Sequence, residues 1–562
     1  MGLVVVVASG LVWRAVDLQL LTRDFLQDHG DARHLREVEI PAHRTMIADR
    51  NGEPLAISTI VKSVWAVPSQ VITQRHRWKE LAGMLDTTVA HLDALITPRA
   101  KREFLYLKRH VEPELARRIV DANIAGVALQ DEYKRYYPSG EITGHVLGFT
   151  NVDDDGQEGV ELAFDEQLRG HSGRKRVIRD RLGRIVEDVE EIRPVVPGVP
   201  VVLSIDRRLQ YIAYRELKAA IAKHHARAGS VVIIDPLTGE VLAMVNQPSF
   251  NPNNRTTTRP AVYRNRAVTD LFEPGSPIKA FTIAAALESG QFKPEVKINT
   301  SPGYFMVGRD KVQDINNYGV LDLGGIIEKS SNVGAAKVAL AMEPENLYSM
   351  LSRAGFGAPL LTGFPGEATG KLAPPENWRE IEHATLSFGY GLSVTPLHLA
   401  HAFGAIANDG VIRPVTMLRQ DTAPAGERIM SAKTARTVRE MMVRVVESGT
   451  AKAAHVPGFR VAGKTGTVHK STESGYAEDR YVSIFTGMLP ATSPRLVAVI
   501  MVDEPTPDEH FGGQVAAPVF AGIMLEAVRI LNIPGDAEFP PATEYFAELK
   551  ARAPAAIAEV AQ

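Results

Sequence analysis

The pattern of apolar and polar positions divides the chain near residue 200. Residues 35–200 are rich in charge and carry short strand-like runs, as in "EIPAHRTMIADRNGEPLAIS", where Asn51-Gly52 predicts a turn between two strands. The proline-rich stretch "RPVVPGVP" at 193–200 predicts a domain boundary. Beyond it, "AGSVVIIDPLTGEVLAMVNQP" predicts a hairpin of two apolar strands.

Helical patterns accompany the strands of the second region. "LSIDRRLQYIAYRELKAAIAKHH" begins with Ser204 and Asp206 as possible helix caps and then runs helically. We interpret the adjacent histidines of this predicted helix, His224 and His225, as surface residues, because no third metal ligand lies nearby. Further on, "FRVAGKTGTVH" and "LVAVIMVDE" predict two neighbouring strands.

The two ends of the chain differ from the rest. "GLVVVVASGLVW" at 2–13 carries no charge but is too short to cross a hydrocarbon core, which needs about 20 apolar residues. It also lacks the basic region of a signal peptide. We expect residues 1–21 to be the back half of a transmembrane anchor, with a buried strand or helix as the alternative. Residues 537–562, rich in Ala, Pro and Glu, are expected to form a tail.

Composition excludes several classes of function. A chain of 562 residues is too long for one core, so two or more domains are expected. The net charge of -3 gives no indication of a nucleic-acid surface. The absence of cysteine excludes disulfides, thiolate metal sites and cysteine nucleophiles.

One short stretch, "GFRVAGKTGT" at 458–467, fits two catalytic motifs. It satisfies the phosphate-loop pattern G-x-x-x-x-G-K-[ST], and its Lys464-Thr465-Gly466 satisfies the K-T-G motif of penicillin-interacting serine enzymes. A phosphate loop needs a buried strand before it and a helix after it, and the sequence shows neither. We therefore favour the K-T-G interpretation over a nucleotidase.

Two further motifs precede K-T-G in the order such enzymes require. Ser276-x-x-Lys279 opens a strongly apolar helical run, where residues i and i+3 share a face and burial lowers the pKa of a lysine. Ser330-Ser331-Asn332 fits S-x-N before a helix, although alone it is a common helix cap. A second S-x-x-K, at 172–175, is expected to lie in a solvated basic loop.

With these motifs the chain resembles class B penicillin-binding proteins, the membrane-anchored D,D-transpeptidases of peptidoglycan synthesis, in their division-specific branch. The resemblance covers nearly the whole chain, including "HRTMIADRNGEPLA", "GVELAFDEQLRG" and "FGYGLSVTPLHLAHAFGAIANDG". It implies an α+β fold: a C-terminal domain at 201–536 with an antiparallel sheet flanked by helices, on a β-rich dimerisation or pedestal domain at 22–200.

The resemblance also implies a mechanism without metal or organic cofactor. Ser276 attacks the penultimate D-alanine carbonyl of a stem peptide, neutral Lys279 takes its proton, Ser330 relays a proton and Asn332 holds the substrate amide. Lys464 supplies positive potential. The remaining implied substrate-binding residues are Thr465, Gly466 and Thr467, with an aromatic wall of Tyr481 and Phe511. The backbone N–H groups of Ser276 and Thr467 are expected to form the oxyanion hole.

Two histidines depart from the pattern of the family. His469 follows K-T-G-T where relatives often carry Arg or Lys, and His510 precedes Phe511 where close relatives often carry Tyr. Either these are neutral substitutions, or they alter β-lactam affinity in a pH-dependent way, because histidine titrates near neutrality.

The leading prediction is a septal transpeptidase that β-lactams acylate. The alternatives are a D,D-carboxypeptidase or β-lactamase with the same motifs, and a low-turnover penicillin-binding scaffold of the division machinery. The family further implies a single-pass inner-membrane protein with its catalytic domain in the periplasm. Its expected partners are stem peptides ending in D-Ala-D-Ala, a polytopic septal glycosyltransferase and other division proteins, but not nucleic acid.

Overall fold

The computed structural model describes residues 2–17, 35–40, 42–179, 185–255, 259–472 and 475–537. Helix α1 (Gly2–Val16) opens the chain, and several of its apolar side chains are exposed, with Val6 at 70% and Trp13 at 68%. The alternative of a buried element is therefore wrong for this stretch. The tail predicted after residue 537 lies outside the described ranges.

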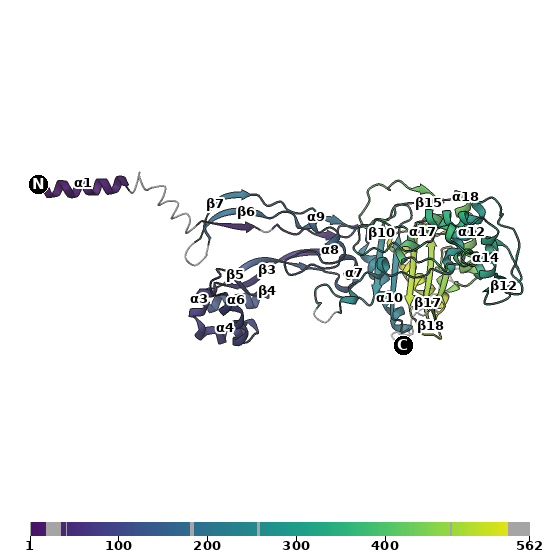
Figure 1. Cartoon of the computed structure of the whole chain (residues 1–562), viewed down its shortest axis with the longest axis horizontal. Helices are drawn as coiled ribbons and strands as arrows, with labels where there is room; N and C mark the ends of the chain where they lie inside the picture. Colours follow the sequence, from purple (N-terminus) through teal and green to yellow (C-terminus); the bar gives the residue numbers. More distant parts are fainter. Residues whose placement is uncertain are drawn as a thin grey trace, which may run out of the picture.

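The N-terminal region is an extended, strand-rich pedestal (Figure 1). Its long strand β3 (Pro54–Ala66) pairs with β5 (Val127–Tyr136) and β4 (Leu105–Val111), and Asn51-Gly52 forms the predicted turn before it. A lobe at the far end of β3 and β5 has its own apolar core, which includes Trp78 and Leu81. The helices of the lobe are α3 (Pro68–Thr73), α4 (Trp78–Leu85), α5 (Val89–Ile96) and α6 (Pro113–Ala122).

A second, three-stranded sheet of the pedestal contains the extra S-x-x-K sequence. Its strands are β1 (Leu35–Ile40), β6 (Gly173–Arg179) and β7 (Ile185–Arg193), with β6 in the middle. Ser172 directly precedes β6 and Lys175 lies within it, so the prediction of a loop at this position is wrong. Lys175 therefore lies on a strand, whereas Lys279 lies on a helix.

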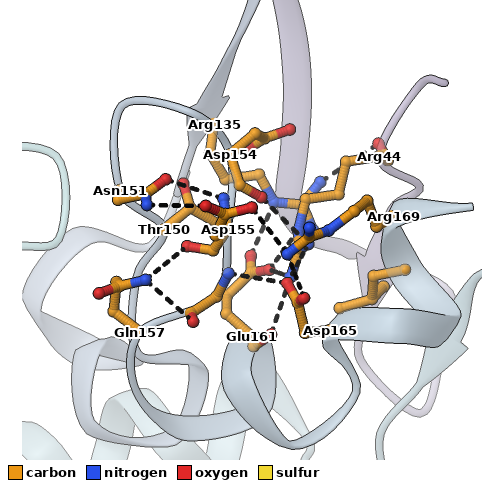
Figure 2. A network of polar contacts seen from close by, with 12 residues as sticks. Arg44, Arg135, Thr150, Asn151, Asp154, Asp155, Gln157, Glu161, Asp165 and Arg169 are labelled. Atoms are coloured by element: carbon orange, nitrogen blue, oxygen red, sulfur yellow. Dashed lines mark hydrogen bonds and ion pairs between the residues drawn. The ribbon is translucent and has the colours of Figure 1, made fainter. Parts of the chain in front are cut away.

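A buried network of charges lies within the pedestal (Figure 2). Glu161, in helix α8 (Gly159–Ala163), accepts hydrogen bonds from the guanidinium groups of Arg44 and Arg135, at 2.8 and 2.7 Å. Arg44 also pairs with Asp165, in helix α9 (Asp165–Arg169), at 2.7 Å. The side chains of Arg44, Arg135 and Glu161 are almost completely buried. At the rim, exposed Arg169 pairs with Asp155.

The C-terminal domain is built on one antiparallel sheet of five strands, in the order β10-β9-β19-β18-β17. Their bounds are β9 (Ala228–Ile234), β10 (Val241–Gln247), β17 (Ala462–Thr472), β18 (Gly475–Leu489) and β19 (Leu496–Asp503). The predicted hairpin is β9–β10. The strands β17 and β19 were expected to be neighbours, which is wrong, because the fifteen-residue β18 pairs with both.

Helices cover both faces of this sheet, which confirms the predicted α+β class. On one face lie α10 (Arg207–Lys223) and α20 (Ala517–Ile530), and the other carries α11 (Arg266–Thr269) and α17 (Pro396–Ala407). Beyond α17 the helical layer contains α12 (Lys279–Glu288), α13 (Leu323–Lys329), α14 (Asn332–Leu340), α15 (Pro344–Arg353), α16 (Glu380–Leu386) and α18 (Ala432–Glu447).

Among the described helices, only the stretch Gly512–Ile530 is long and apolar enough to cross a membrane by composition. Half of it is buried inside the protein, where α20 contacts α10 and the sheet. It is therefore a core helix of the C-terminal domain.

Two predictions about the α10 segment need correction. Asp206 caps α10 by accepting a hydrogen bond from the Arg208 backbone, whereas Ser204 donates to the carbonyl of Val241 and is not a cap. His224 is not a surface residue: it is 3% exposed, and its Nδ1 lies 3.2 Å from a carboxylate oxygen of Glu509. The burial lowers the pKa of His224. His225 is exposed, as expected.

Candidate active site

A sharp turn before helix α12 brings Ser276 and Lys279 together. Ser276 begins the 3-10 turn Ser276–Ile278, and α12 continues from Lys279. Gly275, directly before it, has φ +63°, and a Cβ there would lie 2.4 Å from a methyl group of Val468. Only glycine fits this conformation and this space. The resulting geometry places Lys279 Nζ 3.0 Å from Ser276 Oγ.

The S-x-N sequence forms the turn between helices α13 and α14. Ser330 follows α13 with φ +58°, a left-handed conformation that non-glycine residues rarely adopt. In this conformation its Oγ lies 2.9 Å from Ser276 Oγ, and its carbonyl accepts a hydrogen bond from Lys279 Nζ. Ser331 caps α14, and Asn332 Oδ1 accepts from Lys279 Nζ at 2.7 Å.

The K-T-G sequence lies in the edge strand of the sheet. Lys464 stands in β17, paired with Thr486 of β18, and its Nζ donates to Ser330 Oγ at 2.9 Å. The strand continues through the K-T-G motif to Thr472, so no helix N-terminus follows Lys464. The nucleotidase interpretation is therefore wrong, because the backbone that would cradle phosphate belongs to a β-ladder.

The side chains of Ser276, Lys279 and Lys464 form one hydrogen-bonded cluster around Ser330, the Ser330-centred cluster. Its hydroxyl oxygen lies 2.9 Å from Ser276 Oγ, 3.2 Å from Lys279 Nζ and 2.9 Å from Lys464 Nζ. A proton can therefore pass from Ser276 directly to Lys279, or to either lysine through the Ser330 hydroxyl group.

Burial determines the charge of this cluster. Lys279 and Lys464 are both inaccessible to solvent. Burial, and after it the charge of Lys464, holds the pKa of Lys279 well below its usual range. Burial also lowers the pKa of Lys464 to about 7. Lys279 is thus suited to accept a proton, while Lys464 attracts a carboxylate more weakly as the pH rises through neutrality.

The other face of β17 holds the predicted substrate-binding threonines. Thr465 Oγ1 lies 2.9 Å from Thr450 Oγ1, and Thr467 Oγ1 accepts a hydrogen bond from the backbone N–H of Gly512. Gly466 packs against the nucleophile segment, since a Cβ there would lie 3.0 Å from Pro277 Cδ. The structure therefore brings the three motifs together, with Thr465, Gly466 and Thr467 along one strand.

The predicted aromatic wall is a stack in which the histidines take part. His469 and Tyr481 are partners across β17 and β18, with ring centroids 4.7 Å apart. Tyr481 stacks on His510 at 3.9 Å, and His510 contacts Phe511 at 4.5 Å. Phe511 remains 47% exposed. His510 thus lies between the two rings expected to form the wall.

We predict that these histidines change the pH dependence of acylation. The Nδ1 atom of His469 lies 2.8 Å from the Ala477 carbonyl oxygen, which can only accept, so Nδ1 donates this hydrogen bond. Protonation gives a positive charge that an arginine would carry at every pH. The acylation rate of wild type relative to His469→Arg should therefore rise from neutral toward mildly acidic pH.

Second-order acylation rates measured with a carboxylate-bearing β-lactam test this expectation. Both proteins lose neutral Lys279 at low pH, and the ratio of their acylation rates cancels this shared loss. His510→Tyr separates the contribution of the second histidine. Parallel profiles for all three proteins would show that neither histidine affects acylation.

Sequence reasoning missed two polar residues of the site. Asp314 caps the first turn of α14: its carboxylate accepts from Ser331 Oγ at 2.6 Å and from the Val333 backbone at 3.0 Å. Thr450 contacts Thr465. Asp314 ends a hairpin and Thr450 follows a helix, so neither position carries a pattern that relates it to the three motifs.

The described residues contain no group of three or more His, Cys, Asp or Glu arranged to hold a metal ion. The Ser330-centred cluster consists of serine and lysine side chains, which suits proton transfer and acyl transfer. The fold and this site together define a penicillin-interacting serine enzyme.

Comparison with known proteins identifies the family of this enzyme. Residues 39–203 match the penicillin-binding protein dimerisation domain, and residues 229–525 match the penicillin-binding protein transpeptidase domain. The chain belongs to the penicillin-binding protein family that combines these two domains.

Relatives resemble the chain along nearly its whole length. It is 43% identical over 525 residues to the probable peptidoglycan D,D-transpeptidase PbpC of Pseudomonas aeruginosa, covering 93% of each chain. It is 41% identical over 543 residues to the peptidoglycan D,D-transpeptidase FtsI of Escherichia coli K12, covering 95% of this chain and 92% of that one.

Solved structures of penicillin-binding proteins are also similar to this chain. The transpeptidase domain of Burkholderia pseudomallei penicillin-binding protein 3 is 45% identical, with a TM-score of 0.56, over 60% of this chain and 98% of that one. Penicillin-binding protein 3 of Mycobacterium tuberculosis, solved with aztreonam, is 28% identical, with a TM-score of 0.70, over 89% of this chain and 99% of that one.

Proposed function

We propose that this protein is a peptidoglycan D,D-transpeptidase of septal cell-wall synthesis, acylated and inhibited by β-lactams. The observation that carries the proposal is the Ser330-centred cluster, in which Ser276 Oγ lies 3.0 Å from a buried lysine of lowered pKa. Relatives named as peptidoglycan D,D-transpeptidases, at 41–43% identity, support it.

In the proposed acylation step, Ser276 Oγ bonds to the penultimate D-alanine carbonyl carbon and gives its proton to neutral Lys279. Backbone N–H groups of Ser276 and Thr467 stabilise the oxyanion, and Asn332 holds the substrate amide. The bond to the terminal D-alanine then breaks, and Ser330 passes a proton to the leaving amine. Lys464, Thr465 and Thr467 bind the terminal carboxylate.

In the second step an amine of a neighbouring stem peptide attacks the acyl-enzyme. A new amide forms, the ester to Ser276 breaks, and the serine regains its proton through the same cluster. Water in place of the amine would give the carboxypeptidase reaction, which the Ser276 cluster alone does not exclude. The 39–203 match to a dimerisation domain favours the transpeptidase, because a free hydrolase needs no pedestal.

We further propose that α1 belongs to a single-pass anchor in the inner membrane, with the catalytic domain in the periplasm. Its exposed apolar side chains support an apolar surrounding for this helix. A polytopic septal glycosyltransferase and other division proteins are the proposed partners, by analogy with the family.

Product analysis tests the assigned reaction. Incubation with uncross-linked peptidoglycan strands that carry pentapeptide stems should yield cross-linked dimers together with free D-alanine. A Ser276→Ala protein in parallel controls for background. Shortened stems without dimers would identify a carboxypeptidase, and an absence of both products from a protein that still binds penicillin would identify a scaffold.

A further inference from the structure

A hairpin beside the site exposes a strip of apolar and basic side chains. Strands β12 (Tyr304–Val307) and β13 (Asp310–Gln313) pair antiparallel, with Tyr304 opposite Gln313 and Met306 opposite Lys311. Because side chains alternate along a strand, these four lie on one face. Tyr304 is 46% exposed and Met306 53%. Exposed apolar clusters of this kind mark binding surfaces.

The opposite face of the hairpin is packed into the protein. Val307 and Val312 are each 3% exposed, and Phe305 lies beneath the ammonium group of Lys337. β13 contacts α14, the helix that begins at Asn332. The hairpin is therefore a fixed platform, and the exposure of Tyr304 and Met306 does not result from loose packing.

The exposed face is also basic. Lys311 Nζ lies 4.6 Å from the centre of the Tyr304 ring, a cation–π contact between diagonal partners of the two strands. The hairpin exposes two cations, Arg309 in the turn and Lys311, and one carboxylate, that of Asp310. The face thus combines an ordered aromatic ring, a flexible thioether and a net positive charge.

The strip ends beside the catalytic residue Asn332. The backbone carbonyl of Gln313, its last residue, accepts a hydrogen bond from Asn332 Nδ2 at 3.2 Å. The next residue, Asp314, holds the turn that carries Ser330 and Asn332. Ile315, two positions beyond Gln313, is 80% exposed. A ligand that reaches Asn332 along this side passes over the hairpin.

We propose that the face formed by Tyr304, Met306, Lys311 and Gln313 binds the polymeric part of the substrate, the saccharide–peptide strand outside the reacting D-Ala-D-Ala terminus. A tyrosine ring packs against the C–H face of a sugar, and Lys311 pairs with carboxylates of the stem peptide. The inference rests on the proposed function and assigns a binding surface to the polymer.

Co-sedimentation of the full chain with uncross-linked peptidoglycan strands tests the surface without requiring turnover. The double variant Tyr304→Ala/Met306→Ala should bind these strands about tenfold more weakly, as expected for removing an aromatic anchor. Lys311→Glu should weaken binding most at low ionic strength, since exposed charges are screened by salt. Acylation by a small fluorescent penicillin should remain within about twofold of wild type in both, because remote contacts act on the larger substrate.

Tyr136→Ala is the matched control, because Tyr136 is similarly exposed, at 48%, but lies on the pedestal strand β5. Unchanged strand binding by the hairpin variants, or an equal loss with Tyr136→Ala, would overturn the inference. Failure of the wild type to form cross-links would instead count against the proposed function, and the binding comparison would still decide the role of the hairpin.

Discussion

A Ser276→Ala protein should lose all covalent labelling by a fluorescent penicillin, because the hydroxyl that starts helix α12 beside the buried Lys279 is removed together with the ester it would form. Ser330 Oγ lies 2.9 Å from the position of the Ser276 hydroxyl, but it belongs to the turn between α13 and α14 and not to the start of α12. Denaturing gels of the labelled proteins measure this directly. Removing a triad-type nucleophile costs on the order of 10⁶ in rate.

Ser172→Ala provides the internal control. It removes the serine of the second S-x-x-K, where the paired lysine lies in the pedestal strand β6. Labelling of this protein should equal that of wild type. Labelling that survives Ser276→Ala, or disappears with Ser172→Ala, would show that the nucleophile has been assigned to the wrong serine.

Glu161→Gln should destabilise the protein more than any exposed ion-pair variant. Glu161 is completely buried and holds two buried guanidinium groups, those of Arg44 and Arg135 (Figure 2). Loss of its charge leaves these cations without their central partner. Breaking a buried pair from one side costs about 3–5 kcal/mol. Scanning calorimetry should show a clearly lowered melting temperature.

Asp155→Asn is the matched comparison, because the Asp155–Arg169 pair belongs to the same network but is exposed. Its loss should cost about 0–1 kcal/mol. Both proteins should retain penicillin acylation at low temperature, since neither residue contacts the Ser330-centred cluster. Equal melting temperatures for the two variants would contradict a central role for Glu161.

Local patterns predicted the strands and helices that carry the motifs. Asp206 caps α10 as the sequence indicates, and the β9–β10 hairpin follows from two apolar runs around a turn. The order of strands did not follow from such patterns. β18 lies between β17 and β19 because the long β17–β18 hairpin folds back on itself, and local periodicity does not encode which strands become neighbours.

The site was predictable only where a motif exists. Ser276, Lys279, Ser330, Asn332 and Lys464 were named from their spacing, and the structure brings them together. Asp314 was not, because its role depends on a hairpin that returns to the start of α14. His224 was misjudged for a related reason: its burial comes from the segment around Glu509, distant in sequence.

The lobe of the pedestal has a consequence for how such chains diversify. Its core is separate from that of the rest of the molecule, and Ala66 and Val127, where the chain enters and leaves it, are partners on adjacent strands. An insert whose two ends meet in this way can be shortened, enlarged or exchanged between genes as a cassette, while the catalytic domain keeps its own core. Recombination at this pair of positions would give descendants different lobes on an unchanged enzyme.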